Sequence, residues 1–344
     1  MYNEAVRGLA LLFALLGLTS STARAADEQP PIVLRMATIA PDGTGWAREL
    51  RAMSRDLETA THGAVRMKWY LGGIAGDEAT AIDRIRRGQL DGVAGALFCG
   101  GLSPTLAVTR VAGMVQNRDE ALHLINHLRP RINEDFKRAG FVSMVVGNFG
   151  NDIIFLRDRV SSFEELRKRP MWIWNADLVL RRQMALMGLN MVPAPIDQLS
   201  PMYDGARIDG MFVIPTAALA FQWTTRAKYF IEMRSSMLAG CMTVSQKAYD
   251  SLTFEQQQIL MSAAAKFQVR FEELGRREDA LLLGGALERQ GVKKLMTSDS
   301  LRAAFIEAAS AARGKLDDKT IPSSLVKESL DVLATYRAAH HPPR

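Results

Sequence analysis

Alternating strand and helix signals dominate this sequence and recur in two blocks. In the first block, an apolar segment at residues 32–37 precedes a helical pattern at 46–61 and an alternating apolar–polar segment at 65–70. A second helical pattern at 78–87 leads into an apolar strand at 91–98. Strands joined in this way by helices form right-handed parallel crossovers, so this order predicts an α/β sheet.

The second block repeats this plan and then turns back toward the first. We expect strands at 141–146, 153–156, 171–174, 191–193 and 210–213, and short helices opening at 162, 178 and 198. A strand at 238–244 is expected to return to the first unit. Thr253 and Gln256 fit a capping box that opens a helix toward Gly284, long enough to run across both units.

Two α/β units connected by more than one crossover form a cleft, and such clefts bind small molecules by hinge closure. We therefore expect a two-domain α/β fold with a ligand cleft between the domains and a long domain-spanning helix. The expected parts are domain I at 32–147 plus about 238–252, domain II at 148–237, a connecting helix at 253–290 and a C-terminal helical segment and tail at 291–344.

The N-terminal residues have the pattern of a secretory signal. Arg7 precedes an apolar run at 8–18, and Ala23-Arg24-Ala25 offers a small-x-small cleavage site. The run is too short to span a bilayer comfortably. The pattern predicts a signal peptide at 1–25, cleavage after Ala25 and a periplasmic protein.

Charge and cysteine content exclude several functions. The 43 basic and 37 acidic residues give a net charge of +6, and the basic residues are scattered, which indicates a solvated surface rather than a nucleic-acid site.

Export permits a disulfide between Cys99 and Cys241, but their apolar contexts slightly favour two buried free thiols. Because the chain has no CxxC motif and its five histidines are dispersed, we expect no metal, no cofactor and no enzymatic activity.

Five motifs occur in order along the chain. They are IVLRMATIAPDGTGW at 32–46, GAVRMKWYLGGIAGDE at 63–78, IRRGQLDG at 85–92, SFEELR at 162–167 and PTAALAFQW at 215–223. Together they resemble the substrate-binding proteins of tripartite ATP-independent periplasmic (TRAP) transporters, in particular the DctP-like or T-component branch. The resemblance covers roughly residues 32–295. It implies a periplasmic binding protein fold, a small-molecule ligand and membrane permease subunits as partners.

The sequence departs from this family where a carboxylate ligand would be held. The resemblance implies an arginine on the strand at 171–174, whose guanidinium pairs with a carboxylate through two hydrogen bonds. Trp172 stands there, Asp152 stands near a second family arginine, and Ile214 replaces an asparagine before the cleft proline. Burying an unpaired carboxylate costs several kcal/mol. We therefore expect a hydrophobic or weakly polar ligand, such as a lipid-like molecule.

Candidate ligand-binding residues lie at strand ends and near the predicted crossover between domains. They are Trp172, Trp174, Trp46, Phe98, Phe149, Gly150, Asn151, Phe212, Ile214, Pro215, Glu78 and Asp152. Trp172 and Trp174 are two residues apart on a strand, so their side chains point to the same face.

Several candidates also have a structural alternative. For the tryptophans the alternative is packing in the core. For residues 149–151 it is a hinge between the domains. For Glu78 it is an acid at a helix N-terminus, and for Asp152 a solvated turn.

Two further functions remain open at the level of sequence. One is a receptor for a small carboxylate that uses another cation, such as Arg181, Arg182 or a bound metal. The other, of a different class, is a protein-interaction or lipid-carrier module that works with a periplasmic helical-repeat protein. In each case we expect a monomer that binds no nucleic acid.

Overall fold

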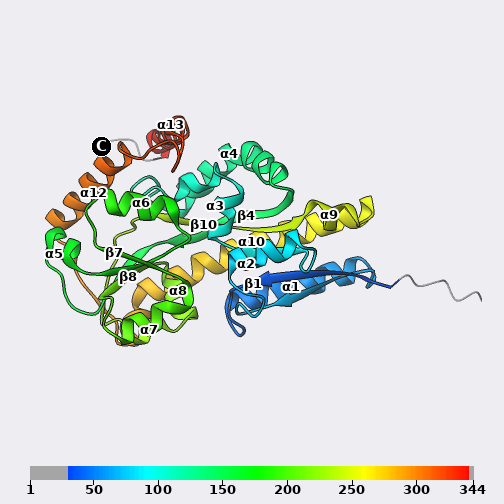
Figure 1. Cartoon of the computed structure of the whole chain (residues 1–344), viewed down its shortest axis with the longest axis horizontal. Helices are drawn as coiled ribbons and strands as arrows, with labels where there is room; N and C mark the ends of the chain where they lie inside the picture. Colours follow the sequence, from blue (N-terminus) through cyan, green and yellow to red (C-terminus); the bar gives the residue numbers. More distant parts are fainter. Residues whose placement is uncertain (1–29, 341–344) are drawn as a thin grey trace, which may run out of the picture. The chain divides into compact units, whose positions relative to one another are not determined.

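The computed structural model of the protein describes residues 30–340, so the predicted signal peptide lies outside the described residues. The described strands form two sheets. One sheet has five strands in the order β2-β1-β3-β10-β4, and the other has six in the order β11-β9-β5-β8-β6-β7. Helices flank both sheets (Figure 1), which confirms the expected α/β class.

The five-stranded sheet contains the first block of the sequence. Its strands are β1 (Ile32–Thr38), β2 (Val65–Tyr70), β3 (Gly92–Gly95), β4 (Phe141–Asn151) and β10 (Met237–Ser245). β1 pairs in parallel with β2 and β3, as the crossovers predict, and β10 pairs antiparallel with β3 and β4. The strand expected at 238–244 therefore does return to the first sheet.

Helices on both sides of this sheet bury apolar stripes against it. They are α1 (Gly45–Ala60), α2 (Glu78–Arg86), α3 (Leu97–Leu102), the 3₁₀ turn η1 (Leu106–Arg110), α4 (Arg118–Arg138) and α9 (Gln246–Asp250). In α1, Thr44 caps the helix by accepting a hydrogen bond from the Ala47 amide at 3.2 Å. The buried residues Ala47, Leu50, Met53 and Leu57 follow at helical spacing.

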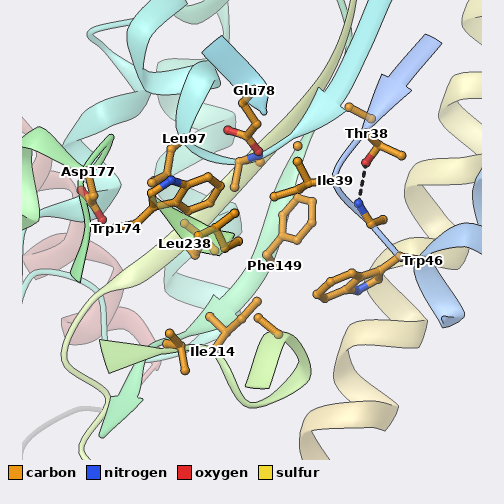
Figure 2. Close-up of a pocket in the computed structure, with 18 of the residues that line it drawn as sticks. Thr38, Ile39, Trp46, Glu78, Leu97, Phe149, Trp174, Asp177, Ile214 and Leu238 are labelled. Carbon is orange, nitrogen blue, oxygen red and sulfur yellow. Dashed lines mark hydrogen bonds between the residues drawn. The ribbon is translucent and has the colours of Figure 1, made fainter. Parts of the chain in front are cut away.

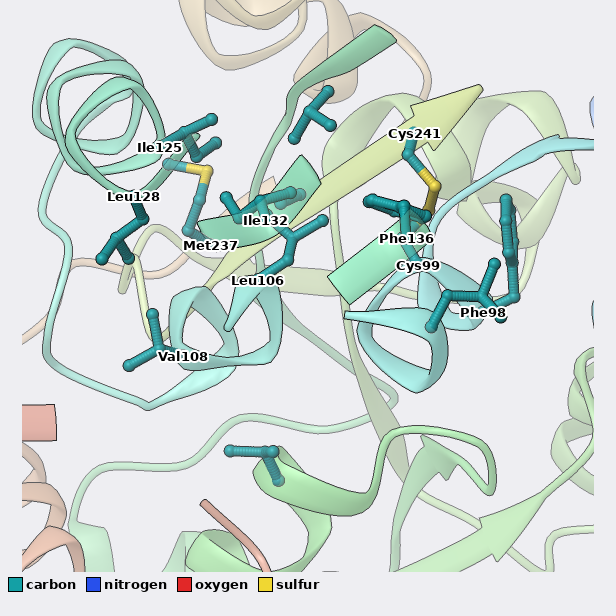
Figure 3. Close-up of a cluster of buried hydrophobic side chains, with 14 of the residues drawn as sticks. Phe98, Cys99, Leu106, Val108, Ile125, Leu128, Ile132, Phe136, Met237 and Cys241 are labelled. Carbon is teal, nitrogen blue, oxygen red and sulfur yellow. A yellow bond between two sulfur atoms is a disulfide. The ribbon is translucent and has the colours of Figure 1, made fainter. Parts of the chain in front are cut away.

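The strand expected at 91–98 is shorter than predicted. β3 ends at Gly95, and Leu97 and Phe98 begin α3. The carboxylate of Glu78 accepts hydrogen bonds from the amides of Ala96 at 2.8 Å and Phe98 at 2.9 Å, which satisfies the first turn of the new helix. Phe98 consequently packs in the core, near Phe136, rather than at the end of a strand (Figure 3).

Cys99 and Cys241 form a disulfide that joins α3 to β10 (Figure 3). Their Cα atoms are 5.8 Å apart, and both residues belong to the same buried cluster. The slight preference for free thiols was therefore wrong, because neither apolar context reveals that the two positions lie opposite each other.

The six-stranded sheet contains most of the second block, whereas the strand expected at 141–146 is β4 and belongs to the five-stranded sheet. Its strands are β5 (Ile153–Leu156), β6 (Met171–Trp174), β7 (Met191–Ala194), β8 (Gly210–Val213), β9 (Tyr229–Ile231) and β11 (Lys293–Lys294). Its helices and 3₁₀ turns are α5 (Phe163–Lys168), α6 (Leu178–Leu186), η2 (Ile196–Gln198), α7 (Leu199–Asp204), α8 (Pro215–Ala220) and η3 (Trp223–Thr225). β6 is parallel to β7 and β8, so the carboxyl ends of these strands meet at one edge.

A long helix contacts elements of both blocks. α10 (Phe254–Leu281) opens with the predicted capping box of Thr253 and Gln256, and it packs against α1, β4 and α8 (Figure 1). The helical path is interrupted in η4 (Leu282–Ala286), where Gly285 has φ +116°, before the short α11 (Leu287–Arg289).

The C-terminal helices return to both blocks. α12 (Asp299–Arg313) packs on α5 and α6, and α13 (Ser323–His340) packs on α4. No helix of residues 30–340 is both long and apolar enough to cross a membrane.

Candidate functional site

An apolar cavity is bounded by residues of both sheets and of α10 (Figure 2). The space open to the centres of water-sized molecules is about 110 Å³. One wall carries the rings of Trp46, Phe149, Phe267 and Phe271, and the other carries those of Trp172, Trp174, Phe212, Phe221 and Trp223. A cavity so rich in aromatic side chains favours an apolar guest.

The first wall is an edge-to-face aromatic cluster. The ring centroid of Phe149 lies 6.0 Å from that of Trp46 and 4.9 Å from that of Phe271. Phe267 and Phe271 are one turn apart on α10 and stack at 5.4 Å. Gly240 on β10 makes room for this arrangement, because a Cβ atom there would collide with the ring of Phe149.

The second wall is formed by residues of β6 and their aromatic neighbours. Trp172 and Trp174 pack in the same apolar cluster, as their spacing on one strand predicts, and both line the cavity. Trp172 is only 2% exposed and its ring centroid lies 5.8 Å from that of Trp223, which in turn stacks on Phe221. Trp172 thus belongs to the core and to the cavity wall at once, whereas Trp174 is half-buried.

One cation lines the cavity among the described residues, and it is already bound by two carboxylates. Arg110 Nη2 donates to Asp152 Oδ2 at 2.8 Å and to Asp177 Oδ2 at 2.5 Å, and Nε donates to Asp177 Oδ2 at 2.8 Å. Ser236 Oγ donates a further hydrogen bond to Asp152 at 2.7 Å. Asp177 also caps α6 through the amide of Leu180. We call Arg110, Asp152 and Asp177 the buried cluster.

The buried cluster has no surplus positive charge. Burial alone would lower the pKa of Arg110, but the charges of Asp152 and Asp177 outweigh this effect and raise that pKa above its usual value. Burial raises the pKa of Asp177, against the lowering effect of Arg110. With both carboxylates ionised the cluster carries one negative charge, and with Asp177 protonated it is neutral.

Glu78 is the remaining ionisable residue of the cavity lining. Burial raises the pKa of its carboxyl group, although the backbone amides of residues 96–98 favour the ionised form. Because these amides bind both carboxylate oxygens, Glu78, the first residue of α2, also holds the start of α3.

The structure brings eight of the twelve predicted residues to the cavity. They are Trp172, Trp174, Trp46, Phe149, Phe212, Ile214, Glu78 and Asp152. Asp152 is neither a free acid nor part of a solvated turn, because it is 2% exposed and paired with Arg110. Arg181 and Arg182 do not line the cavity, so neither is placed to serve as the alternative cation.

The other four predicted residues lie elsewhere. Phe98 is in the core beside the disulfide. Gly150, with φ +141°, lies where β4 leaves the five-stranded sheet. Asn151 and Pro215 line a second, more polar pocket together with Arg118 and Asp279.

Sequence reasoning missed Arg110, Asp177 and the phenylalanines of α10. Arg110 and Asp177 are 67 residues apart, and no local pattern links them. Asp177 does carry a local signal, since an aspartate directly before a helical pattern is a typical N-cap. Phe267 and Phe271 are four residues apart, which places them on one helix face. Within residues 30–340, no group of three or more His, Cys, Asp or Glu residues is arranged to hold a metal ion.

Solved structures with this fold are periplasmic receptors. A TRAP periplasmic solute-binding protein from Haemophilus influenzae with bound L-gulonate superposes with a TM-score of 0.81 at 15% identity, covering 88% of this chain and 99% of that one. The sugar acid binding protein of Advenella mimigardefordensis, in complex with galactonate, gives 0.81 at 15% identity over 89% and 98% of the chains. A TRAP receptor from Desulfovibrio desulfuricans with bound sn-glycerol-3-phosphate gives 0.81 at 18% identity over 89% and 97%.

At these identities the structures establish the fold, a two-domain periplasmic binding protein, and the sequence establishes the family. No curated protein sequence matches the chain. A family model described as DctP, bacterial extracellular solute-binding protein, family 7, matches residues 36–316, which is most of the chain. The chain therefore belongs to the DctP family of bacterial extracellular solute-binding proteins, the periplasmic solute receptors of TRAP transporters.

Proposed function

We propose that this TRAP receptor binds an uncharged, apolar or weakly polar molecule and delivers it to membrane permease subunits. One observation carries the proposal: Arg110, the cation in the cavity lining among residues 30–340, is already bound by Asp152 and Asp177. A ligand carboxylate would enter a cavity whose own charge is zero or negative. It would lose its hydration without gaining a free counter-ion.

The aromatic walls supply the attraction for such a ligand. Burial of apolar area favours binding by about 25 cal/mol per Å² before the costs of association. The receptors from Haemophilus influenzae, Advenella mimigardefordensis and Desulfovibrio desulfuricans hold L-gulonate, galactonate and sn-glycerol-3-phosphate, all of which are acids. Trp172, at the position where the sequence resemblance implies a carboxylate-binding arginine, sets this chain apart from that ligand class.

The proposal includes two domains that close on the ligand. The five-stranded sheet would belong to domain I (32–147 plus about 238–252) and most of the six-stranded sheet to domain II (148–237). Residues 149–151 would serve as one hinge between them. The receptor would act as a monomer with no enzymatic activity of its own.

Replacing Asp177 with asparagine tests the charge argument. Asparagine keeps the shape and remains a good N-cap for α6. It removes one carboxylate from Arg110, so we expect the affinity for octanoate to rise roughly tenfold while the affinity for 2-octanone changes little. Both affinities are measured by displacement of the uncharged fluorophore N-phenyl-1-naphthylamine.

Asp77→Asn is the matched control, because Asp77 caps α2 in the same way but is exposed and does not line the cavity. It should leave both affinities unchanged. A wild-type protein that binds octanoate or L-gulonate more tightly than 2-octanone would refute the proposed ligand class. An unchanged octanoate affinity in Asp177→Asn would refute the role of the buried cluster in excluding carboxylates.

A further inference from the structure

Two hydrogen-bond donors of the cavity lining have no partner in the described structure. Arg110 uses Nε and Nη2 for the two aspartates, but its Nη1 is buried and unpaired. The indole Nε1 of Trp172 is likewise buried and unpaired. Buried donors without partners are unfavourable, so a native protein normally supplies one, from itself, from water or from a ligand.

These two atoms have the same chemical requirement. Guanidinium and indole N–H groups can only donate hydrogen bonds, so the missing partner must be an acceptor. The other buried, unpaired polar atoms belong to residues that do not line this cavity. The unsatisfied polarity of the cavity thus consists of donors alone.

Both donors belong to residues near Trp174, because Trp172 lies two positions before it on β6. Arg110 binds Asp177, whose amide donates to the carbonyl of Trp174 at 3.0 Å. Figure 2 shows Asp177 and Trp174 together on one side, with Trp46 on the far side beyond Phe149. The far side is lined by the aromatic cluster of Trp46, Phe149 and Phe271.

From this arrangement we infer that the ligand is an apolar molecule with a neutral acceptor oxygen, such as a ketone or ester carbonyl, held by Arg110 Nη1 and Trp172 Nε1. The inference rests on the proposed function and names its ligand class. The oxygen lies at the Trp174 end, and the apolar body extends toward Trp46. A carboxylate oxygen could also accept these bonds, but its charge would meet Asp152 and Asp177.

The test compares 2-octanone with 2-methyl-1-octene, in which a methylene group replaces the carbonyl oxygen at similar shape. Each compound displaces N-phenyl-1-naphthylamine from the wild type and from Trp172→Phe, which keeps a ring but removes the indole donor. The ratio of the two affinities is compared between proteins, so that differences in hydration cancel. We expect Trp172→Phe to reduce the preference for the ketone about fivefold.

Arg110→Lys provides a second variant, because lysine keeps the positive charge beside the aspartates but lacks the planar fork. It should reduce the preference for the ketone about tenfold or more, since the lost donor is charged. Trp69→Phe is the control: Trp69 Nε1 donates to Ser54 outside the cavity, so the ratio should stay at the wild-type value.

We call the binding of the ligand oxygen by Arg110 Nη1 and Trp172 Nε1 the anchor. The outcomes test this anchor separately from the proposed function. An unchanged ratio in Trp172→Phe and Arg110→Lys, with both uncharged compounds still binding, would overturn the anchor alone and would indicate that water satisfies the donors. Displacement by octanoate but by neither uncharged compound would overturn the proposed function and the anchor with it.

Discussion

Replacement of Arg110 with methionine is expected to lower the free energy of unfolding by about 3–5 kcal/mol. Methionine fills a similar volume but leaves Asp152 and Asp177, which are 2% and 4% exposed, without a cation. Removing one partner from a buried charge cluster is far more costly than the cluster's net contribution to stability, because the remaining charges lie uncompensated. Urea unfolding at pH 7.5 measures the loss.

The loss of unfolding free energy in Arg110→Met should also depend on pH. Without Arg110, the main effects that oppose the burial-raised pKa of Asp177 are lost, and the weaker hydrogen bond from the Leu180 amide remains. A carboxyl whose pKa is raised on folding destabilises the fold above that pKa, and the penalty disappears as the pH falls through it. The difference between wild type and Arg110→Met should therefore be smaller at pH 5 than at pH 7.5.

Arg226→Met is the matched control for this experiment. Arg226 also forms two hydrogen bonds with an aspartate, Asp204, but the two side chains are 28% and 58% exposed. Exposed ion pairs contribute at most about 1 kcal/mol, so this variant should be nearly as stable as wild type. Equal losses in the two variants would mean that the buried cluster is not a special feature of the fold.

Removal of the disulfide is expected to have a comparable effect. Cys99 and Cys241 are 142 residues apart, and closing a loop of this size stabilises a protein by roughly 4–5 kcal/mol in the chain-entropy relation. The double variant Cys99→Ala/Cys241→Ala should lose about this amount, as measured by urea unfolding. Wild type treated with a thiol reductant should lose a similar amount.

The single variants sharpen this prediction. Either one removes the same crosslink, so each should lose nearly as much stability as the double variant rather than half of it. Losses below about 1 kcal/mol in all three, together with a wild type insensitive to reductant, would contradict a stabilising role for the bond.

The sequence was most informative where local patterns decide the structure. The strands β2, β5, β6 and β8 begin and end where the pattern places them, because turn residues and helix caps flank short apolar runs. The strand expected at 91–98 is too long because the local pattern is ambiguous at its end. Leu97 and Phe98 suit a strand or a helix equally, and the carboxylate that organises α3 comes from Glu78, far earlier in the chain.

In the candidate site, too, local patterns predict some features, whereas contacts between distant residues are not predictable from them. The spacing of Trp172 and Trp174 predicts a shared face, and both side chains pack in the same apolar cluster. The partners of Arg110 lie 42 and 67 residues away, and the partner of Cys99 lies 142 residues away. Such pairs depend on how the elements pack, so no local signal identifies them.

The most direct test of the central claim is to identify what the receptor retains in its own periplasm. Native mass spectrometry of the gently purified protein, followed by denaturation and analysis of the released molecule, gives the mass and charge class of the ligand. The buried cluster and the aromatic walls predict an uncharged, largely apolar molecule with an acceptor oxygen. A tightly retained dicarboxylate or sugar acid would contradict the account.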